Sequence, residues 1–307
     1  MARVVVTGGA GFIGSHVAEA FLARGDDVLV VDDLSAGRED NVPAGAAFEQ
    51  VDIVDAAALG RAFESYAPTL VCHLAAQASV PVSVQRPDYD LSVNVHGTLN
   101  VLAAATRAGA VVVFASTGGA LYGNEAPLPT PEETATEPLS PYGASKLAGE
   151  AYVSTWARLH DAAHVILRLS NVYGPRQSAH GEAGVVAIFS SALLRGEPPP
   201  LRGNGAPTRD YTHVKDIALA FVAAADGGRA GTFNVGTGKQ TSTAELLDLL
   251  QAAAGTDIAP QQDLLQPGEL QTSALDASRI ERELGWRPTI DVEQGIRETY
   301  DWYEASS

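Results

Sequence analysis

Two groups of residues in this sequence have the types and the spacing that catalysis requires. The first is Tyr142-Gly-Ala-Ser-Lys146, in which the four-residue spacing places a phenol and an ammonium on one face of a helix. A free tyrosine has a pKa of about 10, and a nearby cation favours the phenolate. Such a pair is therefore a candidate general base. Because the spacing is common, the alternative is an ordinary exposed Tyr–Lys pair.

Two hydroxyl groups precede this pair. Ser116 and Thr117 end an apolar, strand-like run in the segment FASTGGALYG. A strand-end hydroxyl followed by the tyrosine and the lysine is the order that a dehydrogenase site requires. We take Thr117 as the candidate, although the sequence leaves open which of the two hydroxyls faces the site.

The second group is the glycine-rich segment TGGAGFIG, directly after the first predicted strand. Gly8, Gly11 and Gly14 have the spacing of a dinucleotide-binding turn, in which backbone N–H groups and a helix N-terminus approach a pyrophosphate. Asp32 ends the next predicted strand, the expected place for a carboxylate that binds the adenosine ribose. The alternative for Asp32 is a helix or turn cap. The group predicts a dinucleotide cofactor.

The apolar pattern indicates which elements position these groups. Strand-length apolar runs alternate with helical segments, such as residues 91–109, and this predicts a parallel sheet with helices on both faces. We predict an α/β fold in which residues 1–169 form a Rossmann-type, doubly wound parallel sheet that binds the dinucleotide cofactor. Residues 170–307 mainly form a smaller mixed α/β lobe that binds the substrate. Residues 210–236 are expected to return to the main sheet.

Composition restricts the partners. With 307 residues, of which 46% are hydrophobic, the chain can bury a large core, and its net charge of −17 argues against nucleic acid or an anionic membrane surface. The single cysteine, Cys72, excludes an intrachain disulfide and lies in an apolar run. The histidines lack metal-ligand spacing, so we expect no metal. Because no signal peptide or membrane-spanning run is recognisable, we expect a cytoplasmic protein.

The motifs resemble those of the extended short-chain dehydrogenase/reductase family, most closely its UDP-hexose 4-epimerases. The resemblance covers essentially the whole chain, through VVVTGGAGFIGSH, VVDDLS, HLAAQASV, NVHGTLNVL, FASTGGALYG, SPYGASK, RLSNVYGPRQ, TRDYTHVKD and LDASRIERELGW. It implies a tightly held NAD and an enzyme that inverts C4 of a UDP-sugar, such as UDP-glucose or UDP-galactose, through a 4-keto intermediate. It also implies a homodimer formed by helices around residues 89–107 and 142–160, whose apolar faces would otherwise be taken as core.

The resemblance further implies a role for individual residues. The catalytic residues would be Thr117, Tyr142 and Lys146. The residues at NAD would be Gly8, Gly11, Phe12, Ile13, Gly14, Asp32, Asp33, Asp52, Ile53, Leu74, Ala75, Ala76, Gln77, Asn94, Tyr142 and Lys146. The residues at the substrate would be Ser79, Thr117, Tyr142, Asn171, Arg209, Glu269 and Ser273.

Neighbouring positions separate the activities within the family. Relatives that are 4,6-dehydratases have an Asp-Glu pair where this chain has Gly118 and Gly119, because elimination of water needs an additional acid and base. A UDP-glucuronate 4-epimerase ranks second, since relatives with that activity resemble a pattern with Thr in place of Asn171. A non-catalytic dinucleotide sensor would have lost Tyr142 or Lys146, and both are present.

Three positions bear on the substrate. Arg209 matches the family arginine that pairs with the nucleotide phosphates, and its alternative is an ion pair with Asp210 or Asp216. A second family arginine is replaced by Gln266. Ser273 aligns with the residue beside C2 of the sugar, where a bulky aromatic would exclude an N-acetyl group. A small serine therefore predicts that N-acetylhexosamine sugars are also accepted, unless Ser273 merely belongs to a polar loop.

Overall fold

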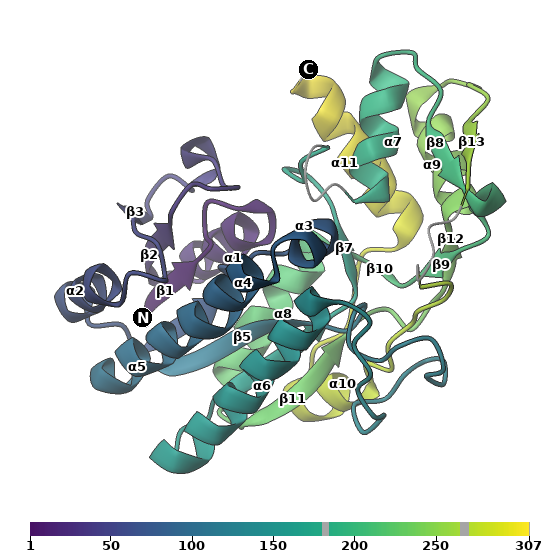
Figure 1. The fold of residues 1–307 in the computed structure, drawn as a ribbon. Coiled ribbons are helices and arrows are strands. Elements are labelled where there is room, and N and C mark those ends of the chain that lie inside the picture. Colours follow the sequence, from purple (N-terminus) through teal and green to yellow (C-terminus); the bar gives the residue numbers. More distant parts are fainter. Residues whose placement is uncertain (180–183, 265–269, 307) are drawn as a thin grey trace.

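The fold, seen in a computed structural model that describes residues 1–179, 184–264 and 270–306, is centred on one parallel sheet (Figure 1). The sheet has seven strands in the order β11-β6-β5-β4-β1-β2-β3. Because the chain moves outward from β1 in one direction and from β4 in the other, the sheet is doubly wound. The predicted Rossmann-type fold is therefore confirmed.

The strands of this sheet are short and mostly buried, as expected for parallel strands covered on both faces. They are β1 (Arg3–Thr7), β2 (Asp27–Asp32), β3 (Ala47–Gln50), β4 (Leu70–His73), β5 (Val111–Thr117), β6 (Val165–Leu169) and β11 (Gly231–Val235). The carboxyl ends of parallel strands meet at one edge of a sheet. Residues that follow different strands are therefore brought together there.

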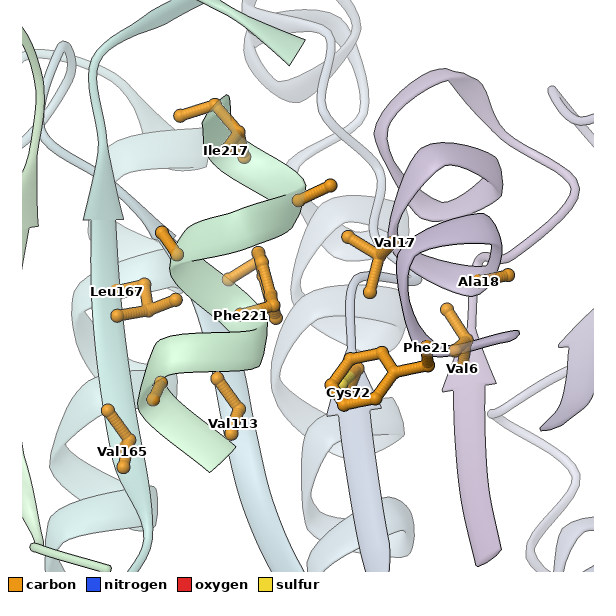
Figure 2. Packing of buried hydrophobic residues seen from close by; sticks show 14 of the residues in the cluster. Val6, Val17, Ala18, Phe21, Cys72, Val113, Val165, Leu167, Ile217 and Phe221 are labelled. Atoms are coloured by element: carbon orange, nitrogen blue, oxygen red, sulfur yellow. The ribbon is translucent and has the colours of Figure 1, made fainter. Parts of the chain in front are cut away.

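Helices cover both faces of the sheet. One face carries α1 (Phe12–Ala23), α8 (Val214–Gly227) and α10 (Ser278–Leu284), and the other carries α2 (Ala56–Tyr66), α5 (Thr98–Ala108) and α6 (Pro141–His160). Figure 2 shows the first of these layers, where Phe21 of α1 and Phe221 of α8 pack onto strand residues such as Val113. Cys72 lies in this core as a fully buried free thiol, and burial raises its pKa.

The helical segment predicted over residues 91–109 is longer and less regular in the structure. It begins earlier, with α3 (Val80–Gln85) and α4 (Pro87–Leu91), and passes through the π-helical turn η2 (Ser92–Gly97) before α5. A π-turn contains an extra residue, and such turns often occur at functional sites. The predicted NAD residue Asn94 lies within it and is buried.

A smaller lobe lies beside the sheet and has a hydrophobic core of its own (Figure 1). Its helices are α7 (Val185–Leu194), α9 (Thr243–Ala254) and α11 (Val292–Ala305). Short strands pair around them and link the two parts: β7 (Asn171–Tyr173) with β10 (Tyr211–His213), β9 (Thr208–Arg209) with β12 (Thr241–Ser242), and β8 (Pro200–Arg202) with β13 (Gln261–Asp263). The remaining short turns are η1 (Glu39–Asn41) and η3 (Gly203–Gly205). Within the described residues, none of the helices has the length and apolar character that crossing a membrane requires.

Asp216, on α8, fastens the segment between α10 and α11 to the sheet layer. Its buried carboxylate accepts hydrogen bonds from the backbone N–H groups of Thr289 and Ile290, both 3.0 Å, and from the Thr289 hydroxyl, 2.8 Å. Its backbone carbonyl accepts from the indole N–H of Trp286, 2.9 Å. One side chain therefore satisfies three donors of a segment that would otherwise lack partners.

We predict that Asp216→Ala destabilises the protein by about 2–4 kcal/mol, because several donors lose a charged acceptor at once. Urea unfolding followed by circular dichroism measures this. The matched control is Asp226→Ala on the same helix, where an exposed carboxylate pairs with Arg24 at 2.6 Å. Its expected cost is below about 1 kcal/mol. Equal losses in the two variants would contradict the role assigned to Asp216.

Candidate active site

The glycine-rich turn between β1 and α1 is shaped by close approaches of the backbone. Gly8 has a φ of +71°, and a Cβ there would lie 2.6 Å from the backbone nitrogen of Ala75. A Cβ on Gly14 would overlap the carbonyl oxygen of Gly8. The turn is thus restricted to glycine, and the first residues of α1, Phe12 and Ile13, follow it directly. The N–H groups of a helix N-terminus favour an anion at such a place.

Asp32 lies at the carboxyl end of β2 beside this turn. It is only 7% exposed, and its two carboxylate oxygens accept from the backbone N–H groups of Leu34, 2.8 Å, and Ala10, 3.0 Å. Burial raises its pKa. The carboxylate therefore does cap a turn, and it lies at the carboxyl edge of the sheet, where a ribose is expected. Asp33 bonds instead within its own turn, to the N–H and the hydroxyl of Ser35.

The other residues predicted to bind NAD follow neighbouring strands. Asp52 is exposed, and Ile53 is buried against Gly97, just after β3. The segment after β4 contacts the glycine-rich turn, since the Ala75 N–H donates to the Thr7 hydroxyl, 3.3 Å. These residues share the carboxyl edge of the sheet; they are Asp52, Ile53, Leu74, Ala75, Ala76 and Gln77.

Together these features fit NAD. A turn open only to glycine would admit the diphosphate to the N-terminus of α1, and a carboxylate at the end of β2 would accept the ribose hydroxyls. Among residues 1–179, 184–264 and 270–306, no three His, Cys, Asp or Glu side chains gather closely enough to hold a metal ion.

The Tyr–Lys pair lies at the start of α6. Ser140 caps this helix by accepting from the Gly143 N–H, 3.1 Å, so Tyr142 and Lys146 occupy its first two turns. Lys146 is 4% exposed, and its ammonium lies 4.6 Å from the ring centroid of Phe114 on β5. Burial lowers the pKa of Lys146 to about 8, although the carboxylates of Glu150 and Asp90 oppose this shift. The pair is thus not an ordinary exposed one.

The structure distinguishes the two candidate hydroxyls. Ser116 is 4% exposed and donates a 2.6 Å hydrogen bond to Oε1 of Glu150 on α6. Thr117, one residue further along β5, is partly exposed, and its side chain makes no hydrogen bond in the part of the chain that is described. Ser116 is therefore occupied by a structural contact, and Thr117 is the hydroxyl available to a ligand.

Of the two glycines after Thr117, Gly118 leaves little room for a larger side chain, whereas a Cβ on Gly119 would make an ordinary contact. A Cβ on Gly118 would overlap the side chain of Leu275, and one on Gly119 would lie 3.4 Å from Oδ1 of Asn171. An acidic residue at position 118 would therefore require Leu275 to move. The close approach also brings Asn171 and Leu275 next to the loop that carries Thr117.

A buried polar network supports the site, and the sequence interpretation missed it. Glu150 and Arg168 form a two-pronged ion pair, with contacts of 2.7 and 2.9 Å, and both side chains are nearly inaccessible to solvent. Arg168 also donates to the Tyr122 hydroxyl, 2.7 Å, which in turn donates to Asn234 on β11, 2.9 Å. An arginine within the apolar run VILRL, with a glutamate four residues after Lys146, was the signal that could have found it.

Asn94 belongs to a second buried network. Its side-chain nitrogen donates to the Gln77 carbonyl, 2.8 Å, to Asp90, 3.1 Å, and to the Ser145 hydroxyl, 3.0 Å. Its oxygen accepts from the Gln77 N–H, 2.9 Å. Asn94 thereby ties η2 to the segment after β4 and to α6. The predicted substrate residue Ser79 caps α3 nearby, accepting from the Val82 N–H.

Arg209 is held on β9 by backbone carbonyls. Its guanidinium donates to Thr208, 2.8 Å, to Leu270, 2.6 Å, and to Gln271, 3.3 Å. The carboxylates of the alternative ion-pair partners have other contacts, because Asp216 bonds to Thr289 and Ile290, and Asp210 accepts from Thr237, Gly238 and Leu275. Arg209 therefore positions the segment that leads to Ser273.

Ser273 lies close to the loop of the candidate hydroxyl. It is 9% exposed, its N–H donates to the Thr208 carbonyl, 3.2 Å, and it lines a small cavity together with Gly118 and Gly119. Among the residues brought to this end of the sheet are thus Thr117, Asn171 and Ser273. The predicted substrate residue Glu269 and the departure at Gln266 lie outside the described residues.

Comparison with known proteins gives consistent matches. UDP-glucose 4-epimerase of Mycolicibacterium smegmatis is 44% identical over 99% of both chains. The structure of UDP-glucose 4-epimerase from Thermotoga maritima with UDP-glucose has a TM-score of 0.97 at 40% identity, covering 99% of both chains. That of the Thermus thermophilus UDP-glucose 4-epimerase in complex with NAD has a TM-score of 0.94 at 45% identity, covering 99% of this chain and all of the other. Residues 4–236 match the family model, and the chain belongs to the NAD dependent epimerase/dehydratase family.

Proposed function

We propose that this protein is an NAD-dependent epimerase that inverts C4 of a UDP-sugar, with UDP-glucose and UDP-galactose as the first substrates to test. The observation that carries the proposal is the pairing of Tyr142 with the buried Lys146 next to the cofactor edge of the sheet. Thr117 supplies an available hydroxyl, and the glycines that follow it offer no acid–base pair for elimination. The similarity to UDP-glucose 4-epimerases supports the same reaction.

In the proposed mechanism, Tyr142 acts as phenolate and removes the proton of the 4-hydroxyl, while Lys146 stabilises the phenolate and Thr117 orients the hydroxyl. NAD, when bound, supplies hydride transfer from C4 and back. A 4-ketosugar is the intermediate. The nucleotide remains held while the ketosugar presents its other face, and Tyr142 then returns the proton. Arg209 contributes a cation at the nucleotide phosphates in this proposal.

Three finer assignments belong to the same proposal. Residues 170–307 mainly form the substrate-binding lobe, with residues 210–236 belonging to the NAD-binding part. The protein is a homodimer, and the apolar side chains exposed on α3, α4 and α6 support this; they are Val84, Leu91, Tyr152 and Leu159. It acts in the cytoplasm.

The decisive assay incubates the purified protein with single UDP-sugars, without added reductant, and resolves the products. We expect interconversion of UDP-glucose and UDP-galactose. In Tyr142→Phe the turnover should fall by about 10²–10⁴-fold, because the proton acceptor is lost, while NAD stays bound. Near-normal turnover of this variant would exclude Tyr142 as the base. Absence of any C4 epimer with all sugars tested would refute the proposed function.

Cofactor choice provides a second prediction. Asp32 should accept from the ribose hydroxyls and repel a 2′-phosphate, so the wild type should bind NAD more tightly than NADP. Asp32→Ala should weaken NAD binding and reduce this preference. Calorimetry on protein stripped of nucleotide measures both affinities, with Asp27→Ala at the opposite, exposed end of β2 as the matched control. Tighter binding of NADP than of NAD by the wild type would contradict the assignment.

Ser273 leads to a third prediction. A small residue beside the sugar leaves room for an N-acetyl group, so the wild type should epimerise UDP-galactose and UDP-N-acetylgalactosamine alike. Ser273→Tyr should lower kcat/KM for the N-acetyl sugar at least tenfold relative to UDP-galactose, because a steric wall discriminates strongly. If the wild type already refuses the N-acetyl sugar, or if tyrosine leaves the ratio of kcat/KM unchanged, Ser273 does not control access.

A further inference from the structure

Lys146 is a buried cation without a direct ionic partner. Its side chain is almost inaccessible, and it forms no ion pair within the described ranges of the chain. Its ammonium lies 4.6 Å from the ring centroid of Phe114. Keeping an ammonium charged in such a place is costly unless an opposite charge lies near. A negatively charged group is therefore expected near the ammonium of Lys146.

Asp90 is a buried anion in a similar situation. It is 1% exposed and takes part in no ion pair among the described residues. Gln77 and Asn94 donate to it through their side-chain amides, at 2.7 and 3.1 Å, and both bonds end on the same carboxylate oxygen, Oδ1. Two neutral donors on one oxygen leave the second oxygen without a hydrogen-bond donor in the described structure. The negative charge is thus held in place but not neutralised.

Asn94 connects these two charges. The nitrogen that donates to Asp90 also donates to the hydroxyl of Ser145, 3.0 Å, the residue directly before Lys146. The helices α4 and α6 that carry Asp90 and Lys146 pack against each other. The positions of the two charges are therefore fixed relative to one another through one amide.

The other charged and titratable groups around Lys146 are accounted for. Glu150, on the same helix, is neutralised by Arg168 of β6 at 2.7 Å. His73 on β4 lies between the hydroxyls of Thr7 and Thr98, and burial together with Lys146 lowers its pKa to about 3, so it is neutral. Glu150 and Asp90 both raise the pKa of Lys146. Because Glu150 is already paired with Arg168, Asp90 is, besides Tyr142 on α6, the ionisable group that has no ion pair within the described residues.

We propose that Asp90 is a positioning residue that supplies the counter-charge of Lys146 and so keeps the ammonium beside Tyr142 charged during catalysis. The catalytic part of this inference rests on the function proposed above. The charge relation between Asp90 and Lys146 stands independently of it, and the two parts are tested separately.

The test uses Asp90→Asn in the NAD-bound protein. The asparagine carbonyl oxygen can accept both amide bonds that now end on Oδ1, so the variant removes the charge and keeps the contacts. Since the chain has three lysines, Lys146, Lys215 and Lys239, nuclear magnetic resonance of lysine side chains gives few signals, and Lys146→Arg identifies the relevant one. We expect the pKa of Lys146 to be lower by about 1 in Asp90→Asn than in the wild type. An unchanged pKa would overturn the proposal.

The catalytic consequence is read from the pH dependence of kcat. Deprotonation of Lys146 ends activity as the pH rises, so a lower pKa moves this alkaline limb to lower pH. If the pKa of Lys146 is lower by about 1, the deficit in kcat should grow to about tenfold on that limb. The control is Asp88→Asn on the same helix, where the carboxylate is exposed. A loss that is equal at every pH would show a merely structural role and refute the catalytic one. A lowered lysine pKa with no epimerase activity in the wild type would instead refute the proposed function alone.

Discussion

The buried ion pair between Arg168 and Glu150 is the constraint on which the geometry of this site depends. It joins β6 to α6, and its carboxylate also holds Ser116 at the end of β5. A buried pair of this kind adds little net stability compared with apolar packing, but breaking it is costly and its two-pronged geometry is specific. It therefore fixes the position of α6, and with it Tyr142 and Lys146, against the strand that carries Thr117.

Hydrogen bonds also connect the same pair to the segment that contains Ser273. Arg168 donates to Tyr122, which donates to Asn234, and Asn234 donates to the carbonyl of Thr130, 2.8 Å. Thr130 in turn exchanges backbone hydrogen bonds with Ala274 and Asp276, which flank Leu275. A chain of polar contacts thus runs from α6, which carries Tyr142 and Lys146, to the segment that contains Ser273. The position of that segment is therefore set by its hydrogen bonds to the sheet layer and not by the backbone preferences of the loop itself.

The sequence predicted those parts of the fold and site that local patterns specify. The alternation of strands and helices, the glycine turn and the Tyr–Lys spacing all depend on residues close in sequence. The choice between Ser116 and Thr117 could not be made, because it depends on Glu150, which lies 34 residues away. The π-turn at Asn94 was missed because a helical pattern does not reveal one extra residue. Asp90 was overlooked because an acid near a helix start is typical of an exposed position.

The chain and its expected ligands are both negatively charged, and the structure indicates how binding is still possible. A net charge of −17 repels polyanions over long distances, but salt screens exposed charges beyond about 8 Å. A diphosphate bound at the glycine turn would interact with backbone N–H groups at the start of α1, which the net charge does not alter. The site also holds two cations in fixed surroundings: the ammonium of Lys146 lies over the ring of Phe114, and the guanidinium of Arg209 donates to backbone carbonyls. Since Lys146 is buried, a neighbouring anion such as Asp90 affects whether its ammonium stays charged.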